Sequence, residues 1–228
     1  ILNQYDLSQN DEFLKAYIVV MRTYILGCIN DNVSIDASKL GLNYMSYTEL
    51  EDCFGDSFSD VYQKICRLIS ETSMHTITKN NKLITPYYHT MSNGKTRSGF
   101  EILGDEFSYL GKTDCNYDAT SSSLSNTISI PYADFAKSLR GIDSSISISD
   151  DSPLTYIQIV SKDSSGYIIS LSVNGVTIDG NDFCNALSIP SACFSLEDGN
   201  NGLINITYYG LGHGLGLSLN EAQNMAAG

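Results

Sequence analysis

Residues 156–178 read YIQIVSKDSSGYIISLSVNGVTI. Within this stretch, residues 156–160 and 167–173 are rich in β-branched and aromatic side chains, and the polar run between them contains a glycine. That pattern is typical of two strands joined by a turn. Asn174-Gly175 is a strong signal for a tight turn, and residues 176–178 supply a further short strand. The segment therefore predicts three consecutive strands that pair through their turns.

Two segments nearer the N-terminus carry helical spacing instead. Residues 11–29 are apolar on nearly every side, although they include charged positions. In residues 56–70, Val61, Ile65 and Leu68 recur at intervals of four and three, with polar residues between them. The sequence thus predicts an α+β fold with a buried N-terminal helix. We expect this helix to pack with mixed or antiparallel sheets that form a cleft.

The remaining chain divides into strands and loops. Residues 74–78 and 83–89 flank a turn-forming cluster and predict a hairpin, and residues 203–209 predict a last strand. Residues 119–126 and 150–153 are predicted loops. A weak composition shift near Thr120 suggests a subdomain boundary at about 120–150 within one domain of residues 1–228.

Charge and hydrophobicity exclude some partners. The 228 residues include 13 basic and 26 acidic ones, which gives a net charge of -13. Such a surface repels nucleic-acid phosphates and anionic lipids, so nucleic acid is not an expected partner. The apolar stretch 13–29 contains Lys15 and Arg22 and is shorter than the roughly 20 residues of a membrane span. Because the chain begins at Ile1, we expect that an upstream signal or anchor has been removed.

The helix at 11–29 carries the first candidate site. Glu12 lies in its first turn, and Lys15 and Arg22 project beside the stripe that Glu12 begins. A first-turn carboxylate is favoured by the helix dipole. The spacing alone therefore fits both a capping glutamate with an ion pair and a catalytic acid.

Residues 86–96, PYYHTMSNGKT, form the second candidate. A predicted strand ends in Tyr87, Tyr88 and His89 and runs into a Ser-Asn-Gly turn. Sugars bind such surfaces because their C–H faces pack on rings and their hydroxyls need fixed partners. The same pattern also fits a hairpin tip with a hydrogen-bonded histidine.

Residues 210–218, GLGHGLGLS, form the third candidate. Glycines at alternating positions let a backbone pass close to another element or to a ligand, and the sequence leaves both possibilities open. The stretch lacks the Gly-Lys-Ser/Thr ending of a phosphate-binding loop, so it does not indicate a nucleotide site.

Together these segments resemble the SpoIID/LytB family, the stage II sporulation protein D domain. Residues 12–24 are similar to the family's helix E-A-L-K-A-Q-A-x-A-A-R-T-Y, and residues 87–96 to its F-x-H-S-x-S-G-G-x-T motif. Residues 108–110 resemble its P-Y-L element and residues 187–194 its L-x-L-R-S-x-x-F element. Residues 210–226 resemble its closing G-x-G-H-G-x-G-M-S-Q-x-G-A-x-x-M-A. The order holds over essentially the whole chain.

The resemblance implies a lytic transglycosylase that cleaves MurNAc–GlcNAc strands of peptidoglycan, free of stem peptides, to 1,6-anhydro ends. It implies Glu12 as the catalytic acid, no cofactor and no metal. It also implies a cell-wall amidase as partner and an extracytoplasmic location, anchored at the engulfing septum of a spore former. The substrate-binding residues implied are Lys15, Arg22, Tyr88, His89, Ser92, Thr96, Gly212, His213 and Ser218.

The acid step requires a carboxyl that stays protonated near neutral pH. We expect Glu12 to be buried among Phe13, Val19 and the tyrosines, which would raise its pKa. Lys15 and Arg22 would oppose that rise, so we expect them to bind substrate or to pair with other groups. Glu12, His89 and His213 are then expected to converge on one cleft.

Departures from the family pattern keep two alternatives open. Asn93, Pro190, Leu219 and Glu221 replace residues of the motifs. They allow a module that binds glycan or enhances an amidase without catalysis. A metal-dependent hydrolase has less support, because the six cysteines and three histidines form no CxxC or HExxH pattern. Thr90 stands where some members place a cysteine after the motif histidine. The six cysteines are compatible with three disulfides or with buried thiols.

Overall fold

The computed structural model describes residues 9–29, 36–42, 44–199 and 201–228. The chain forms two compact units, one of residues 1–87 with 222–228 and the other of residues 88–221. The composition shift near Thr120 lies inside the second unit and does not coincide with their boundary. An α+β fold is confirmed, since helices and antiparallel sheets both occur.

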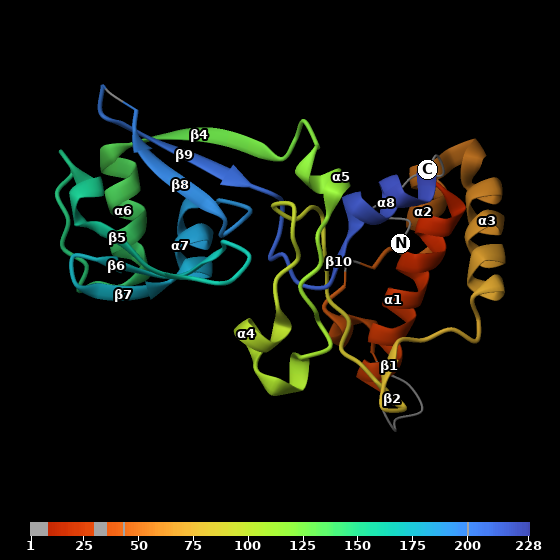
Figure 1. Ribbon diagram of the computed structural model, residues 1–228. Coiled ribbons are helices and arrows are strands. Elements are labelled where there is room, and N and C mark those ends of the chain that lie inside the picture. The colour runs from red at the N-terminus through yellow and green to blue at the C-terminus, as the bar shows by residue number, and fades with distance from the viewer. Residues whose placement is uncertain (1–8, 30–35, 43, 200) are drawn as a thin grey trace. The chain divides into compact units, whose positions relative to one another are not determined.

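The first unit is built mainly from helices (Figure 1). Its elements are α1 (Asp11–Ile29), a 3-10 helix (Ala37–Leu40), α2 (Tyr47–Phe54), a 3-10 helix (Gly55–Ser57), α3 (Phe58–Glu71), β1 (Thr78–Lys79) and β2 (Lys82–Leu83). The last helix, α8 (Leu219–Ala227), continues into this unit at its C-terminal end. No helix in the described ranges is long and apolar enough to cross a membrane.

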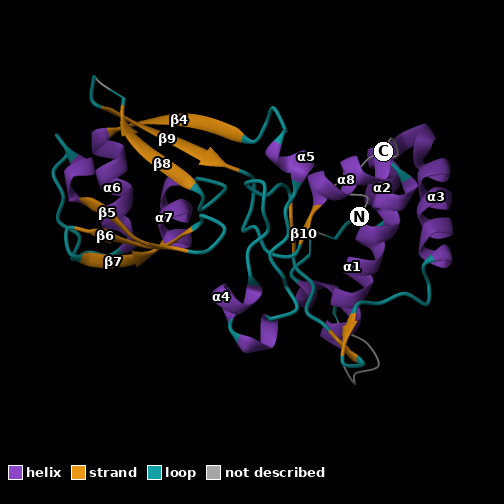
Figure 2. Cartoon of the chain, in the orientation of Figure 1, coloured by secondary structure: helices purple, strands orange, loops and turns teal. Residues whose placement is uncertain are grey.

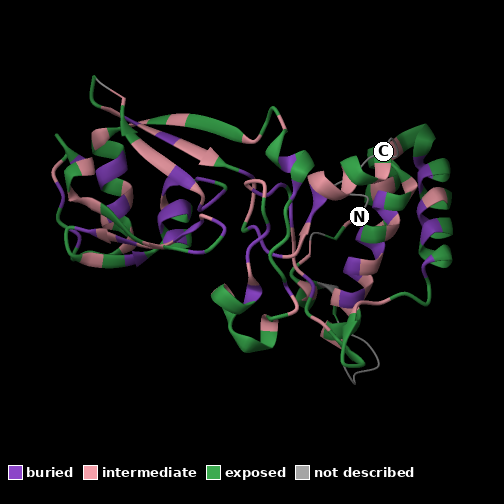
Figure 3. Cartoon of the chain, in the orientation of Figure 1, coloured by how far each residue is buried: buried purple, intermediate pink, exposed green. Residues whose placement is uncertain are grey.

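Helix α1 has the bounds that the sequence predicts. The Asn10 side chain accepts a hydrogen bond from the Glu12 amide at 2.8 Å and thereby caps the first turn. Helix α1 packs against α3 and β2. The predicted stripe of α3, Val61, Ile65 and Leu68, is buried, and buried and exposed positions alternate along α3 in Figure 3. Because the large sheets belong to the other unit, a cleft between them and α1 stays a prediction.

The hairpin that follows α3 is confirmed, although its strands are shorter than predicted. Thr78 pairs with Leu83 and Lys79 with Lys82. Asn80 and Asn81 form the turn, with φ of 52° and 61°. Two consecutive residues of positive φ match the right-handed twist of the strands, and asparagine tolerates that conformation well.

The second unit contains two three-stranded sheets and the helices between them (Figures 1 and 2). The strands are β3 (Tyr88–His89), β4 (Ser125–Pro131), β5 (Ile157–Lys162), β6 (Ile168–Val173), β7 (Val176–Asp179), β8 (Phe194–Asp198), β9 (Leu203–Tyr209) and β10 (Leu217–Ser218). The helices are α4 (Gly99–Leu103), α5 (Asn116–Ala119), α6 (Tyr132–Ile142) and α7 (Gly180–Leu187), with 3-10 helices at Asp105–Phe107 and Pro153–Tyr156. The strands lie side by side in the orders β4-β9-β8, β5-β6-β7 and β10-β3.

The predicted run of three strands forms the sheet β5-β6-β7, and both of its pairs are antiparallel. Asn174 and Gly175 have φ of 49° and 85°, as a tight turn of this kind requires. Figure 1 shows α6 and α7 between this sheet and the sheet β4-β9-β8. Fully buried side chains from all three layers, including Phe135, Leu171 and Ile206, form the main hydrophobic core.

Some elements of the second unit differ from the sequence prediction. Strand β4 begins at Ser125, inside the loop predicted at 119–126. Its partner β9 pairs Ser125 with Tyr209 and Pro131 with Leu203, so a segment about eighty positions away stabilises it. Helices α6 and α7 were not predicted, because each is short and its apolar face is covered only by distant strands.

Candidate functional site

Glu12 lies in the exposed first turn of α1. Its side chain is 71% exposed, and its carboxylate accepts a hydrogen bond from Lys15 Nζ at 2.9 Å. The expectation that Glu12 is buried among Phe13, Val19 and the tyrosines is therefore wrong. Successive residues project from different sides of a helix. Phe13 and Tyr17 lie on the buried side of α1, whereas Glu12 projects from the exposed side.

Lys15 is shared between two carboxylates. Its Nζ lies 2.9 Å from Glu12 and 3.0 Å from Glu71 on α3. The hydrogen bond to Glu12 first, and that to Glu71 second, raise the pKa of Lys15. The expectation that Lys15 binds substrate or pairs with other groups is met by Glu71, but Lys15 pairs with Glu12 as well. Glu71 in turn accepts from Arg67, which also pairs with Asp11 at 2.7 Å. An exposed network of ions surrounds Glu12.

Arg22 pairs with other groups, which is one of the two outcomes expected for it. Its guanidinium donates to the Thr72 carbonyl, to the His75 carbonyl at 3.2 Å and to the Ile69 carbonyl at 3.0 Å. Thr72 Oγ1 accepts a further bond at 3.1 Å. Arg22 therefore satisfies carbonyls at the C-terminal end of α3, where a cation is favoured by the helix dipole.

In the second unit the His89 motif and the glycine-rich motif lie side by side. Strands β3 and β10 pair in parallel, so that Tyr88 is opposite Leu217 and His89 is opposite Ser218. A Cβ atom added to Gly212 would lie 2.9 Å from the His89 Cβ. The close-packing explanation of the glycines is confirmed, because the loop comes too near β3 for a side chain at this position.

His89 is buried in the neutral form. It is 4% exposed, and its Nδ1 lies 3.0 Å from the Leu215 carbonyl, so Nδ1 carries the proton and donates it. Its Nε2 is buried without a hydrogen-bond partner among the described residues. Burial is the main cause that lowers the pKa of His89 to about 4. The ring of His213, which is exposed, lies 5.8 Å away between centroids.

Asp118 in α5 hydrogen-bonds to both motifs, although nothing in the sequence pattern marks it. This carboxylate is fully buried. It accepts hydrogen bonds from Ser92 N at 2.8 Å, Ser92 Oγ at 2.6 Å, Ser218 Oγ at 2.7 Å and Asn220 Nδ2 at 2.9 Å. Several donors to one carboxylate are what a buried charge requires. We call these four residues the Asp118 clamp.

A buried ion pair between Arg97 and Asp163 also holds the glycine-rich loop of residues 210–218. Arg97 Nε donates to Asp163, and both side chains are inaccessible to solvent apart from a few per cent of Arg97. The Arg97 amide donates to the Gly214 carbonyl at 2.7 Å, and its guanidinium donates to the His213 carbonyl at 3.2 Å. The guanidinium also lies 4.8 Å from the ring centroid of Tyr167. Arg97 directly follows residues 86–96, but no spacing signal distinguishes it.

Two known proteins are similar in sequence to nearly the whole of this chain. No family model matches the chain. It is 27% identical over 224 residues to stage II sporulation protein D of Bacillus subtilis (strain 168), covering 94% of this chain and 63% of that protein. It is 25% identical over 223 residues to the protein of the same name from Bacillus amyloliquefaciens, covering 94% of this chain and 62% of that protein. The chain is thus similar over nearly its whole length to stage II sporulation protein D. It spans somewhat less than two thirds of the length of these relatives.

Several of the residues that are predicted to bind substrate form contacts within the protein instead. Ser92 and Ser218 are buried in the Asp118 clamp. Thr96 is buried as well, and its Oγ1 donates to the Gly111 carbonyl and accepts from the Thr113 amide. Gly212 donates its N–H to the Pro190 carbonyl at 2.9 Å. Tyr88 is half-buried in β3. Their roles in binding substrate remain predictions.

The structure brings His89, Ser92, Gly212, His213 and Ser218 together within the second unit. Glu12, Lys15 and Arg22 belong to the first unit. Convergence of Glu12 with the two histidines is therefore still a prediction.

One group of side chains has donor atoms close enough for a metal. Cys115, Asp118 and Glu221 place one ligand atom each within 4.8 Å of one another. However, Asp118 is held by the clamp, and Glu221 accepts from the Tyr117 and Asp118 amides at 2.8 and 3.0 Å. Burial raises the pKa of the Cys115 thiol, which disfavours the thiolate that binds metal. These contacts explain the cluster without an ion. All six cysteines are free thiols.

Proposed function

We propose that the SpoIID-like chain is a lytic transglycosylase that acts on peptidoglycan glycan strands during sporulation. The observation that carries the proposal is the position of Glu12. It is an accessible carboxylate at the N-terminal end of a long, well-packed helix. A polymer strand can reach such a carboxylate, whereas a buried one would be closed to it.

The reaction needs only this one carboxylate. Glycoside hydrolases generally use two, one as acid and one to activate water or to attack the sugar. Here Glu12 leaves Lys15, takes up a proton from solvent and donates it to the glycosidic oxygen while the C1–O bond breaks. The ionised Glu12 then accepts the proton of the sugar's own 6-hydroxyl, whose oxygen closes on C1. The products are a free hydroxyl end and a 1,6-anhydro end, and no water is consumed.

Lys15 is suited to release Glu12 when a strand binds. Because Glu71 also pairs with Lys15, the ammonium keeps one carboxylate partner after Glu12 turns to the substrate. The bound strand would exclude water from Glu12, which the acid step needs. We propose peptide-free strands as the substrate. The partner that prepares them would be a cell-wall amidase, which places the reaction outside the cytoplasm.

The test is mass spectrometry of purified, peptide-free glycan strands after incubation with the protein. We expect new 1,6-anhydro ends. Glu12→Gln keeps the shape of the side chain but cannot transfer a proton, so it should abolish cleavage and leave strand binding nearly intact. Glu51→Gln is the matched control, because it removes another exposed carboxylate of the first unit that has no part in the reaction and should retain cleavage. Reducing ends would indicate hydrolysis, and full activity of Glu12→Gln would exclude this residue.

A second function is favoured by a specific observation. The hydroxyls of Ser92, Thr96 and Ser218 are held internally, and Glu12 is engaged by Lys15. A module that binds glycan or enhances an amidase without cutting strands would tolerate both features. In the same experiment it would retain glycan strands without producing any new ends.

A further inference from the structure

Helix α2 in the first unit has an apolar side that the rest of the chain covers only in part. A capping box stabilises its N-terminus. Ser46 Oγ accepts a hydrogen bond from the Glu49 amide, and the Glu49 carboxylate accepts one from the Ser46 amide. It packs on α3, yet none of its residues is buried. Leu50 and Phe54 are half-buried. A stable amphipathic helix without a buried residue presents surface to a partner.

Two tyrosine rings stand on this surface. Tyr47 is 56% exposed and Tyr62 is 42% exposed, and their ring centroids lie 5.6 Å apart. Both rings contact Phe58, which is buried, at 4.9 and 5.6 Å. Because Phe58 fixes them from beneath, the two rings form a platform that loses little conformational entropy when it binds. Tyr44, three positions before Tyr47, is also exposed.

Carboxylates surround the platform. Residues 40–63 contain five acidic residues and no lysine, arginine or histidine. All five are exposed, and none forms an ion pair with another described residue. They are Glu49, Glu51, Asp52, Asp56 and Asp60. The network around Glu12 differs, because its carboxylates are paired with Lys15, Lys64 and Arg67.

We propose that the surface formed by α2 and the first turns of α3 binds an arginine-rich surface of a partner protein. A guanidinium stacks on tyrosine rings and at the same time forms ion pairs with carboxylates beside them. Tyrosine and arginine are also the residues that dominate binding energy in protein interfaces. The charge disfavours nucleic acid and anionic lipid, and a neutral glycan would leave the carboxylates without counter-charges. A second copy of this acidic chain offers few cations.

The proposal is independent of the proposed function, because it involves neither Glu12 nor the clamp. The probe is an oligoarginine peptide with a photo-crosslinking group, and an oligoglutamate peptide is its negative control. We expect the oligoarginine to crosslink to residues 44–62. Its affinity should fall steeply as ionic strength rises from ~0.1 M to ~1 M, since salt screens exposed charges. Crosslinks spread over other acidic surfaces would overturn the proposal.

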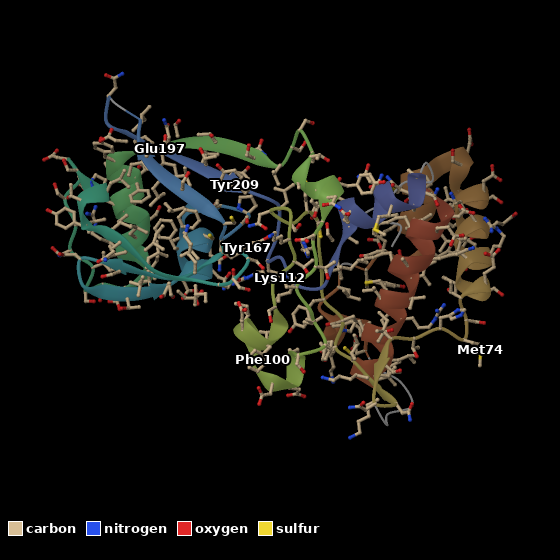
Figure 4. All side chains as sticks on the ribbon, viewed as in Figure 1. Met74, Phe100, Lys112, Tyr167, Glu197 and Tyr209 are labelled. Carbon is tan, nitrogen blue, oxygen red and sulfur yellow. The ribbon has the colours of Figure 1, made fainter. Side chains whose placement is uncertain are left out.

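The decisive comparison uses two double variants. Tyr47→Ser with Tyr62→Ser removes the rings and keeps every charge, and it should weaken binding about tenfold. Tyr117→Ser with Tyr209→Ser removes two exposed rings of the other unit and should leave the affinity unchanged; Figure 4 labels Tyr209 on β9. Equal affinities of the two variants would refute a role for the platform. Circular dichroism checks that both remain folded, and unchanged glycan cleavage by the first variant separates this surface from Glu12.

Discussion

Acidification should destabilise the second unit through His89. The imidazole is 4% exposed, donates from Nδ1 to the Leu215 carbonyl and has no described partner for Nε2. Its pKa falls from the ordinary 6.5 to about 4, chiefly because burial penalises the charged form. At about 1.4 kcal/mol for each pKa unit, this difference corresponds to about 3 kcal/mol of unfolding free energy.

The sign follows from which state takes up the proton. Above pH 6.5 His89 is neutral in both states and adds no pH dependence. Between pH 6.5 and about 4 the unfolded chain binds a proton that the folded chain does not, so the free energy of unfolding falls. Below about pH 4 both states are protonated and this contribution levels off.

Urea denaturation at a series of pH values measures the effect. Far-UV circular dichroism is the suitable signal, because the chain has no tryptophan. His89→Asn retains a donor near the position of Nδ1 but cannot titrate. Carboxylates titrate in both proteins, so the difference between wild type and variant isolates His89. That difference should change by about 3 kcal/mol between pH 6.5 and 4.

His75→Asn, which removes an exposed imidazole, is the matched control. Parallel curves for wild type and His89→Asn across this pH range would refute the reasoning, because His89 would then ionise as readily in the folded state as in the unfolded one.

Three further substitutions test the contacts of the second unit, each by urea denaturation at pH 7. Asp118→Ala removes the acceptor of four hydrogen bonds and should cost about 3 kcal/mol or more, and Asp118→Asn should cost less because it keeps one oxygen. Gly212→Ala should cost about 1–3 kcal/mol, since the new Cβ meets His89 at 2.9 Å and φ is 110°; an unchanged midpoint would refute this close approach. Arg97→Met leaves Asp163 buried without its cation and should cost about 3–5 kcal/mol, a loss that Asp163→Asn in the same chain should partly restore.

Local patterns predicted the elements whose signals are contained within a few residues. The apolar stretch at 11–29, the stripe of Val61, Ile65 and Leu68, and the Asn174-Gly175 turn all appear in the structure where the sequence predicts them. Helical spacing and turn conformations depend on neighbours within about four positions, so the sequence alone specifies them. The clustered glycines also predicted a close approach of the backbone, without identifying the element approached.

The environment of each candidate side chain depended on contacts over long sequence separations. Ser92 and Asp118 are 26 positions apart, and Asp118 and Ser218 are 100 apart, yet one buried carboxylate unites them. No periodicity connects such positions, so two hydroxyls that suggest sugar binding in the sequence became internal donors in the structure.

The sequence by itself predicted an α+β fold, a resemblance to stage II sporulation protein D, a net negative charge and a glutamate in the first turn of the first helix. Only the tertiary structure decided that Glu12 is exposed and paired with Lys15, that His89 is buried and neutral, and that Asp118 and Arg97 hold the glycine-rich loop. The physical reason is that secondary structure follows local backbone preferences. The charge state and accessibility of a side chain instead follow from its burial and its hydrogen-bond partners, which folding brings from distant parts of the chain.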